Sequence, residues 1–207
     1  MKRIGWLLAV SITALTQTGW GAPVYQNQTN DTFLTAVYSV GPYDQIGDLV
    51  TLGGTERGLQ SLTVQFFNLG SVGQFDASLA VWDATATTLL GTAQVTGIGI
   101  GDFSSTDVTF ALSGLVVPDT ISILLGVSNV GAGLDLGLNI FEPPTIGTSD
   151  NTFLLVQTGA VISQGSTPSG EGNLYLQIDA SEVPEPSCWA MVGLGLAGLA
   201  WSKVRAA

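Results

Sequence analysis

The sequence predicts an all-β protein, with an antiparallel β-sandwich of the jelly-roll kind between an N-terminal signal peptide and a short C-terminal transmembrane helix. Apolar and polar residues alternate with a period of two, and turn-forming clusters separate the alternating segments. No helical pattern of about 12 residues precedes the C-terminal tail. The expected divisions are a signal peptide over residues 1–22, a β-sandwich domain over 23–181 and a sorting segment over 182–207.

The first segment has the pattern of a secretory signal peptide. Lys2 and Arg3 give it a basic start, and an apolar run follows over residues 4–15. This run is shorter than the roughly 20 residues of a membrane-spanning helix, so cleavage is favoured over a retained anchor. We expect cleavage near Gly21 or Ala22.

The body contains segments whose alternation predicts half-buried strands. In one of them, Leu62, Val64 and Phe66 fall on one face while Thr63 and Gln65 fall on the other. The segments are residues 59–67, 76–83, 106–114, 120–127, 135–141 and 173–179.

Turn formers separate these strands, and 27 glycines fit a chain with many tight connections. The expected turns and loops are residues 52–58, 68–74, 97–105, 114–119, 129–133 and 164–172. The last of these is interpreted as a loop within one domain, because a further strand follows it. The domain ends at "ASEVPEPS", residues 180–187, where prolines and glutamates stop the last strand.

Charge is distributed very unevenly along the chain. There are 16 acidic residues against five basic ones, and no histidine. Four basic residues, Lys2, Arg3, Lys203 and Arg205, lie close to the termini, so Arg57 is the only one in the body. Such a body repels phosphate backbones, which excludes nucleic acid as a partner, and it lacks a basic face for anionic lipid. We expect Arg57 to pair with a carboxylate of the body.

The residue types argue against catalysis. Nucleophile systems that depend on imidazole are excluded, and both lysines lie in terminal segments. The remaining candidates are the carboxylate pairs Asp76 with Asp83 and Asp102 with Asp107. The first pair is predicted to point to opposite faces of one strand, and the second to lie in a solvated loop. The sequence therefore predicts a non-enzymatic protein.

No cofactor is predicted, and calcium is the one ion left open. The acids between Asp102 and Asp107, or the segment Thr148 to Asn151, could supply oxygen ligands. However, the chain has no EF-hand and no glycine-aspartate repeat, so ordinary solvated loop acids are the favoured interpretation.

The aromatic residues of the strands have two interpretations. They are favoured as core residues, and a sugar-stacking platform stays open as the alternative. The residues concerned are Phe66, Phe67, Phe75, Trp82 and Phe110.

The C-terminal tail has an apolar run from Cys188 to Trp201. A helix of these residues would be about 21 Å long at about 1.5 Å per residue, whereas a hydrocarbon core is about 30 Å thick. The run therefore predicts a marginal anchor. Lys203 and Arg205 beyond it favour a cytoplasmic end, with the body outside. Cys188 is the only cysteine, so the body contains no disulfide.

Val183, Pro184, Glu185, Pro186 and Ser187 precede an apolar segment containing "GLGLAGLAW" and a basic finish. This order resembles the PEP-CTERM sorting signal of Gram-negative bacteria that make exopolysaccharide. The resemblance implies recognition by an exosortase, a multi-spanning membrane enzyme with a cysteine-protease-like site, which removes the tail. The basic end is shorter than the arginine-rich cluster usual in the family.

By this resemblance Val183, Pro184, Glu185, Pro186 and Ser187 form the processing motif. The anchor is assigned to Cys188, Trp189, Leu194, Leu196, Leu199 and Trp201, and the basic end to Lys203 and Arg205. The body is also similar to β-rich bodies often found before this signal, in segments such as "IGDLVTLGGTERGLQSLTVQFFN".

The leading hypothesis is an exported, non-enzymatic protein of the cell surface or exopolysaccharide matrix, processed at its C-terminus by an exosortase-type enzyme. It would cross the inner membrane, remain anchored transiently and then be released outward. Its expected partners are the export machinery, the processing enzyme and exopolysaccharide. The alternatives are an extracellular carbohydrate-binding module, assisted by calcium, and a carboxylate-dependent hydrolase.

Overall fold

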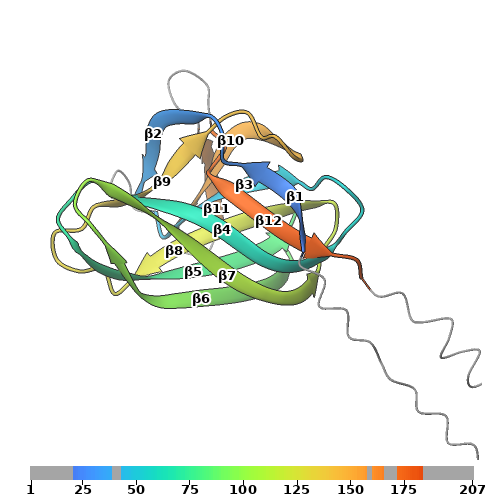
Figure 1. Ribbon diagram of the computed structural model, residues 1–207, viewed down its shortest axis with the longest axis horizontal. Coiled ribbons are helices and arrows are strands. Elements are labelled where there is room, and N and C mark those ends of the chain that lie inside the picture. Colours follow the sequence, from blue (N-terminus) through green and yellow to red (C-terminus); the bar gives the residue numbers. More distant parts are fainter. Residues whose placement is uncertain (1–20, 39–42, 158–159, 166–171, 184–207) are drawn as a thin grey trace, which may run out of the picture.

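The computed structural model describes residues 21–38, 43–157, 160–165 and 172–183 (Figure 1). Within these ranges the chain forms twelve strands, and every strand pairing is antiparallel. The all-β, antiparallel prediction is confirmed. The predicted membrane helix lies outside the described ranges, as do all but the last two residues of the predicted signal peptide. The described ranges contain no helix with the length and hydropathy of a membrane span.

The first sheet is built around β4, the strand with the predicted alternation. One edge of β4 pairs with β7 along most of its length, and its other edge is shared by β12 and then β9. The outer strands are β1, next to β12, and β2, next to β9. The bounds are β1 (Ala22–Asn27), β2 (Asp31–Val37), β4 (Gly58–Asn68), β7 (Ser104–Val116), β9 (Leu136–Phe141) and β12 (Leu176–Ser181).

The second sheet has the order β11-β10-β3-β8-β5-β6. Its edge strand β6 also contacts β7 of the first sheet, so the short turn from β6 to β7 joins the two sheets. The bounds are β3 (Gln45–Thr51), β5 (Gly73–Asp83), β6 (Leu89–Ile100), β8 (Thr120–Ser128), β10 (Thr148–Gln157) and β11 (Ala160–Gly165).

A single large hydrophobic cluster takes side chains from both sheets. Leu62, Val64 and Phe66 of β4 are fully buried in it, as the alternation predicts. The ring centroids of Phe66 and Phe75 lie 5.1 Å apart, which brings β4 and β5 together across the core. The two sheets are therefore held together mainly by burial of apolar side chains.

Asn68, at the end of β4, ties three loops together at one end of the domain. Its Nδ2 donates to the carbonyl oxygens of Ser71 and Gly101, each at 2.7 Å, and its Oδ1 accepts from the backbone N–H groups of Gly70 and Asp135. The β4–β5, β6–β7 and β8–β9 connections thus share one buried amide. In Figure 1 this end lies opposite the end of β12.

Three predicted loops are wrong, at least in part, because bulged strands replace them. Residues 97–105 mostly belong to β6 and β7, and only residues 101–103 form the turn between them. Residues 148–151 begin β10, where the register with β3 shifts between Ser149 and Phe153. Residues 114–116 extend β7. Glycine and asparagine with positive φ occur in these bulges, at Gly97, Gly114 and Asn151, and they gave the sequence the appearance of turns.

Candidate functional site

Asp76 and Asp83, the first predicted carboxylate pair, both accept hydrogen bonds from segments next to β5: Asp76 from the bulge of β6 and the start of the β8–β9 loop, and Asp83 from the turn after β5. Asp76 accepts from the backbone N–H of Gly97 at 2.8 Å and from the amide of Asn129. Asp83 accepts from the backbone N–H of Thr87 at 2.9 Å. The Asn129 amide and the Gly97 N–H lower the pKa of Asp76, and the Thr87 N–H lowers that of Asp83. Acids held ionised in this way are poor proton donors for glycoside hydrolysis.

The second predicted pair does not share a loop. Asp102 lies in the β6–β7 turn, whereas Asp107 lies within β7 and accepts from Gln65 Nε2 at 2.8 Å. The prediction that both are loop acids is therefore wrong for Asp107. Gln65 and Asp107 lie opposite each other on the polar face of β4 and β7, so they form a cross-strand pair of the sheet.

The segment Thr148 to Asn151 is also a strand rather than a loop. Within it, Asp150 Oδ1 accepts from the Thr152 hydroxyl at 2.7 Å, and Asn151 adopts a φ of 62° in the bulge. Among the described residues no three or more acidic, histidine or cysteine side chains could reach one metal ion.

Asp48 is a buried acid that the sequence analysis missed. It lies on the core side of β3 and is 0% exposed. It accepts from Ser149 Oγ at 2.8 Å and from the backbone N–H of Leu174 at 3.0 Å. Burial raises its pKa to about 8, although these hydrogen bonds act in the opposite direction. The sequence signal that could have identified it is its spacing. Asp48 lies two positions from both Ile46 and Val50, which places an acid on the apolar face of the strand.

Asn27 binds the carbonyl group of Leu174, the same residue whose backbone N–H donates to Asp48. Its Nδ2 donates to the carbonyl oxygens of Leu174 and Phe141, at 3.0 and 2.6 Å. Asn27 and Asp48 therefore act as side-chain partners for a stretch of backbone just before β12, and connect it to both sheets.

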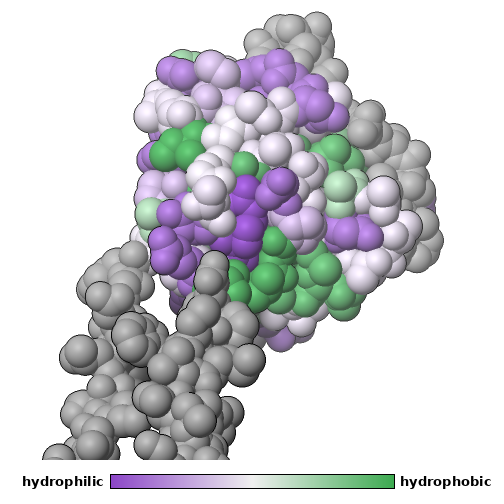
Figure 2. All heavy atoms as spheres, turned by 90° about the vertical axis from the view of Figure 1, so that its right-hand side faces the viewer, coloured by the Kyte–Doolittle hydropathy of each residue, from purple (hydrophilic) through white to green (hydrophobic). Residues whose placement is uncertain are grey.

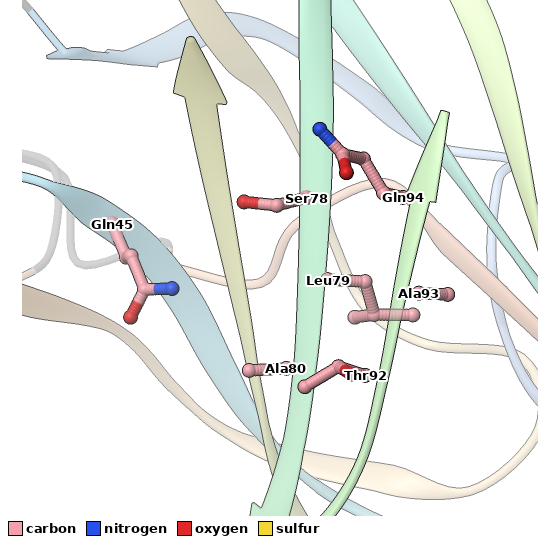
Figure 3. A pocket seen from close by; sticks show the side chains of 7 residues that line it. All are labelled: Gln45, Ser78, Leu79, Ala80, Thr92, Ala93 and Gln94. Atoms are coloured by element: carbon pink, nitrogen blue, oxygen red, sulfur yellow. The ribbon is translucent and has the colours of Figure 1, made fainter. Parts of the chain in front are cut away.

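A hollow of about 310 Å³ lies on the second sheet, over β3, β8, β5 and β6 (Figure 3). Figure 3 shows Gln45 on one side of it and Ser78 and Gln94 on the other. The lining residues are Gln45, Ser78, Leu79, Ala80, Thr92, Ala93 and Gln94. None of them is charged.

Trp82 lies two positions beyond Ala80 on the same face of β5. It packs with Ala80, Leu124, Leu154 and Val156 in a second, smaller apolar cluster. The indole Nε1 is buried and has no hydrogen-bond partner in the part of the chain that the structure describes.

The other aromatic candidates divide between core and partly buried positions. Phe66, Phe75 and Phe110 are buried in the main core, as expected, and Phe67 is partly buried.

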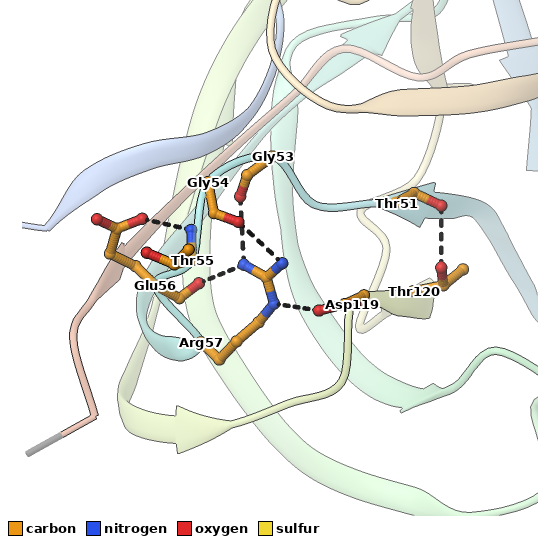
Figure 4. A network of polar contacts seen from close by, with 8 residues as sticks. All are labelled: Thr51, Gly53, Gly54, Thr55, Glu56, Arg57, Asp119 and Thr120. Carbon is orange, nitrogen blue, oxygen red and sulfur yellow. Dashed lines mark hydrogen bonds and ion pairs between the residues drawn. The ribbon is translucent and has the colours of Figure 1, made fainter. Parts of the chain in front are cut away.

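Arg57 forms the predicted ion pair, in the β3–β4 loop (Figure 4). Its Nε lies 2.8 Å from Asp119 Oδ1. Its Nη1 donates to the carbonyl oxygens of Gly53 and Glu56, and its Nη2 to that of Gly54. The guanidinium group thus bridges backbone carbonyl groups within the β3–β4 loop and also connects this loop to the β7–β8 turn.

The same end of the domain is where the chain leaves toward its C-terminus. Ser181, the last residue of β12, pairs with Gly58 and accepts from Gln60 Nε2 at 2.8 Å. Figure 2 shows this end, where apolar side chains gather beside polar ones. Val116, opposite Gly58 on β7, is 58% exposed, and Val183 is 42% exposed.

A family model described as the PEP-CTERM protein-sorting motif matches residues 182–205. The chain carries a PEP-CTERM sorting motif. Such a motif implies an exported protein that an exosortase, a membrane enzyme, processes on its way to the cell surface. No curated protein and no solved structure matches the chain.

The PEP-CTERM match starts at Glu182, directly after the last residue of β12. Of the predicted processing residues, only Val183 is described by the structure. Pro184, Glu185, Pro186 and Ser187 lie outside the described residues, as do the predicted anchor and basic end. Their roles remain predictions.

Proposed function

We propose that this protein is a non-enzymatic protein of the cell surface or exopolysaccharide matrix, released from a transient membrane anchor by an exosortase-type enzyme. The observation that carries this proposal is the PEP-CTERM match over residues 182–205, next to the end of a β domain. The signal peptide over residues 1–22 would bring the chain across the inner membrane through the export machinery.

In this proposal Pro184 and Pro186 hold Glu185 in an extended segment. Proline fixes φ and restricts the residue before it, so the pair disfavours helix between the domain and the anchor. Only Glu182 and Val183 separate Ser181 of β12 from Pro184. The processing enzyme would therefore act within a few residues of the folded domain.

The non-enzymatic role is supported by the state of the candidate acids. Asp76, Asp83 and Asp107 are each held by neighbouring polar groups of the sheets and turns. We also propose that the two sheets form an antiparallel β-sandwich of the jelly-roll kind, supported by their shared core and by the contact of Phe66 with Phe75.

Intact mass and C-terminal peptide mapping test the processing step. The protein is recovered from its native envelope and medium. A mature terminus between Glu185 and Ser187 is expected. Recovery with Ala207 still in place would make it a permanently tethered protein and would contradict the proposal.

A double variant tests the motif itself. Pro184→Ala with Pro186→Ala should leave the tail attached, because the segment loses its enforced extended form. Pro118→Ala, at an exposed proline between β7 and β8, is the matched control and should be processed normally. Normal tail removal in the double variant would exclude the assigned role of the prolines.

A further inference from the structure

The hollow on the second sheet exists because one strand contributes no side chain there. Gly126 of β8 lies between Gln45 of β3 and Ser78 of β5 in the strand register. A Cβ at Gly126 would lie 2.8 Å from Ser78 Oγ and 3.5 Å from Gln45 Cγ. Any larger residue would fill the space, so glycine at this position keeps the hollow open.

Polar groups from three strands face this space. Ser78 pairs with Gln94 across β5 and β6, and Ala80 pairs with Thr92 in the next row. Glutamine amides therefore stand on both sides, with two hydroxyl groups and the methyl group of Ala80 between them. This arrangement offers donors and acceptors without any formal charge.

The polar side chains that line the hollow have no hydrogen-bond partner among the described residues. In the described part of the chain, no hydrogen bond reaches the side chains of Gln45, Ser78, Thr92 or Gln94. Gln74, an exposed residue of β5, likewise has no side-chain hydrogen bond among the described residues, whereas several other glutamines do. Five of them make side-chain hydrogen bonds, namely Gln26, Gln28, Gln60, Gln65 and Gln177.

We propose that this hollow binds an internal segment of a neutral polysaccharide. Sugar hydroxyl groups both donate and accept, so they match glutamine amides and Ser or Thr hydroxyl groups. Asp44 directly precedes Gln45, and Asp76 lies two positions before Ser78 on the same face of β5, so these carboxylates would repel an anionic chain. The site differs from the aromatic platform that the sequence left open, because its contacts come from amides and hydroxyl groups.

The inference goes beyond the proposed function and does not depend on tail processing, since all of these residues lie within the β domain. A failure of glycan binding would leave the intact-mass result unchanged. The two proposals can therefore fail separately.

Affinity electrophoresis of the full-length protein, in a detergent without a sugar head group, tests the site. The probes are dextran, hydroxyethylcellulose and galactomannan as neutral chains, and alginate and polygalacturonate as anionic chains. At least one neutral chain should retard the protein, and more strongly than either anionic chain. Absence of retardation by every neutral chain, or a preference for an anionic one, would overturn the proposal.

Variants then locate the binding. Gln45→Glu with Gln94→Glu keeps the side-chain size but removes two amide donors and adds charge, so affinity should fall about tenfold or more. Gln74→Ala is the matched control, an exposed glutamine on β5 outside the hollow, and should bind as the parent does. The circular dichroism spectrum of each variant should be unchanged. Equal retardation of the double variant and the parent would place binding elsewhere and overturn the assignment.

Discussion

Asp48 forms no ion pair with any of the described residues. The ion pair found among the described residues joins Arg57 and Asp119, and Asp48 is surrounded by neutral partners from Ser149 and Leu174. With a pKa of about 8, it keeps its proton in the native protein at neutral pH.

This proton makes stability depend on pH. In the unfolded chain Asp48 has its ordinary pKa of 3.8, so between pH 4 and pH 8 the native state binds more protons than the unfolded state. The free energy of unfolding should therefore fall as pH rises through this window. Asp48→Asn should remove that slope, because the amide is neutral throughout. Urea unfolding at pH 5, 6, 7 and 8 measures it.

The control for this experiment is Asp102→Asn, at an exposed acid of the β6–β7 turn. It should keep the slope of the parent. An undiminished slope in Asp48→Asn would show that Asp48 does not carry the extra proton.

Arg57 and Asp119 should contribute unequally to stability. The Asp119 side chain is 79% exposed, so Asp119→Asn should cost at most about 1 kcal/mol. Arg57 also donates to three backbone carbonyl groups, so Arg57→Ala should cost more, about 2 kcal/mol. Urea unfolding of both variants gives the difference, and equal losses would contradict this account.

The sequence identified some of these side chains and not others. The pairing of Arg57 with an acid could be predicted because it is the only basic residue of the body. The partners of Asp48 could not, since Ser149 and Leu174 lie 101 and 126 positions away in the chain. Alternation fixes the face on which a residue lies, but it contains no information about which strand packs opposite.

Among the secondary-structure elements, the long alternating strands β4, β5, β7 and β8 were predicted to within a few residues. The sequence analysis predicted no strand for β1, β2, β3 or β11, and it mistook bulged segments for loops. Phe75 pairs with Ile98 and Ala77 pairs with Val95, so residues 96 and 97 of β6 both lie opposite Asp76. A glycine in such a bulge has the same local signature as a glycine in a turn.

Gly97 and Gly99, two positions apart on β6, allow the effect of backbone conformation to be measured separately from the effect of steric crowding. Gly97 has a φ of 68° and Gly99 does not have a positive φ, yet a Cβ at either would meet nothing within 4 Å. Gly97→Ala should therefore destabilise the protein by about 1–2 kcal/mol through backbone strain alone. Gly99→Ala should be close to neutral. Thermal unfolding compares them, and similar midpoints would show that the bulge relaxes.

The two sheets should unfold together, because their side chains share one core. Trp82 is the only tryptophan between residues 21 and 188, so in the processed protein its fluorescence reports the second sheet alone. Its urea transition should coincide with that of far-UV circular dichroism, which follows both sheets. Separate transitions would show two independent units. A reducing agent should shift neither curve, since the body has no cysteine.

The position of β12 sets the order in which this protein can complete its fold. β12 lies between β1 and β4, and Ala22 at the start of the domain pairs with Ala180 near its end. A chain that crosses a membrane from its first residue onward delivers β12 last of all the strands. Until then β1 has no neighbour in its sheet, and one half of β4 has an open edge. In a chain exported in this order, the first sheet could close only after β12 has been delivered, and the sorting motif begins at the next residue, Glu182. The motif that marks the protein for processing thus begins directly after the strand that completes the first sheet. With that order of export, the processing enzyme would act on a domain whose strands have all been delivered.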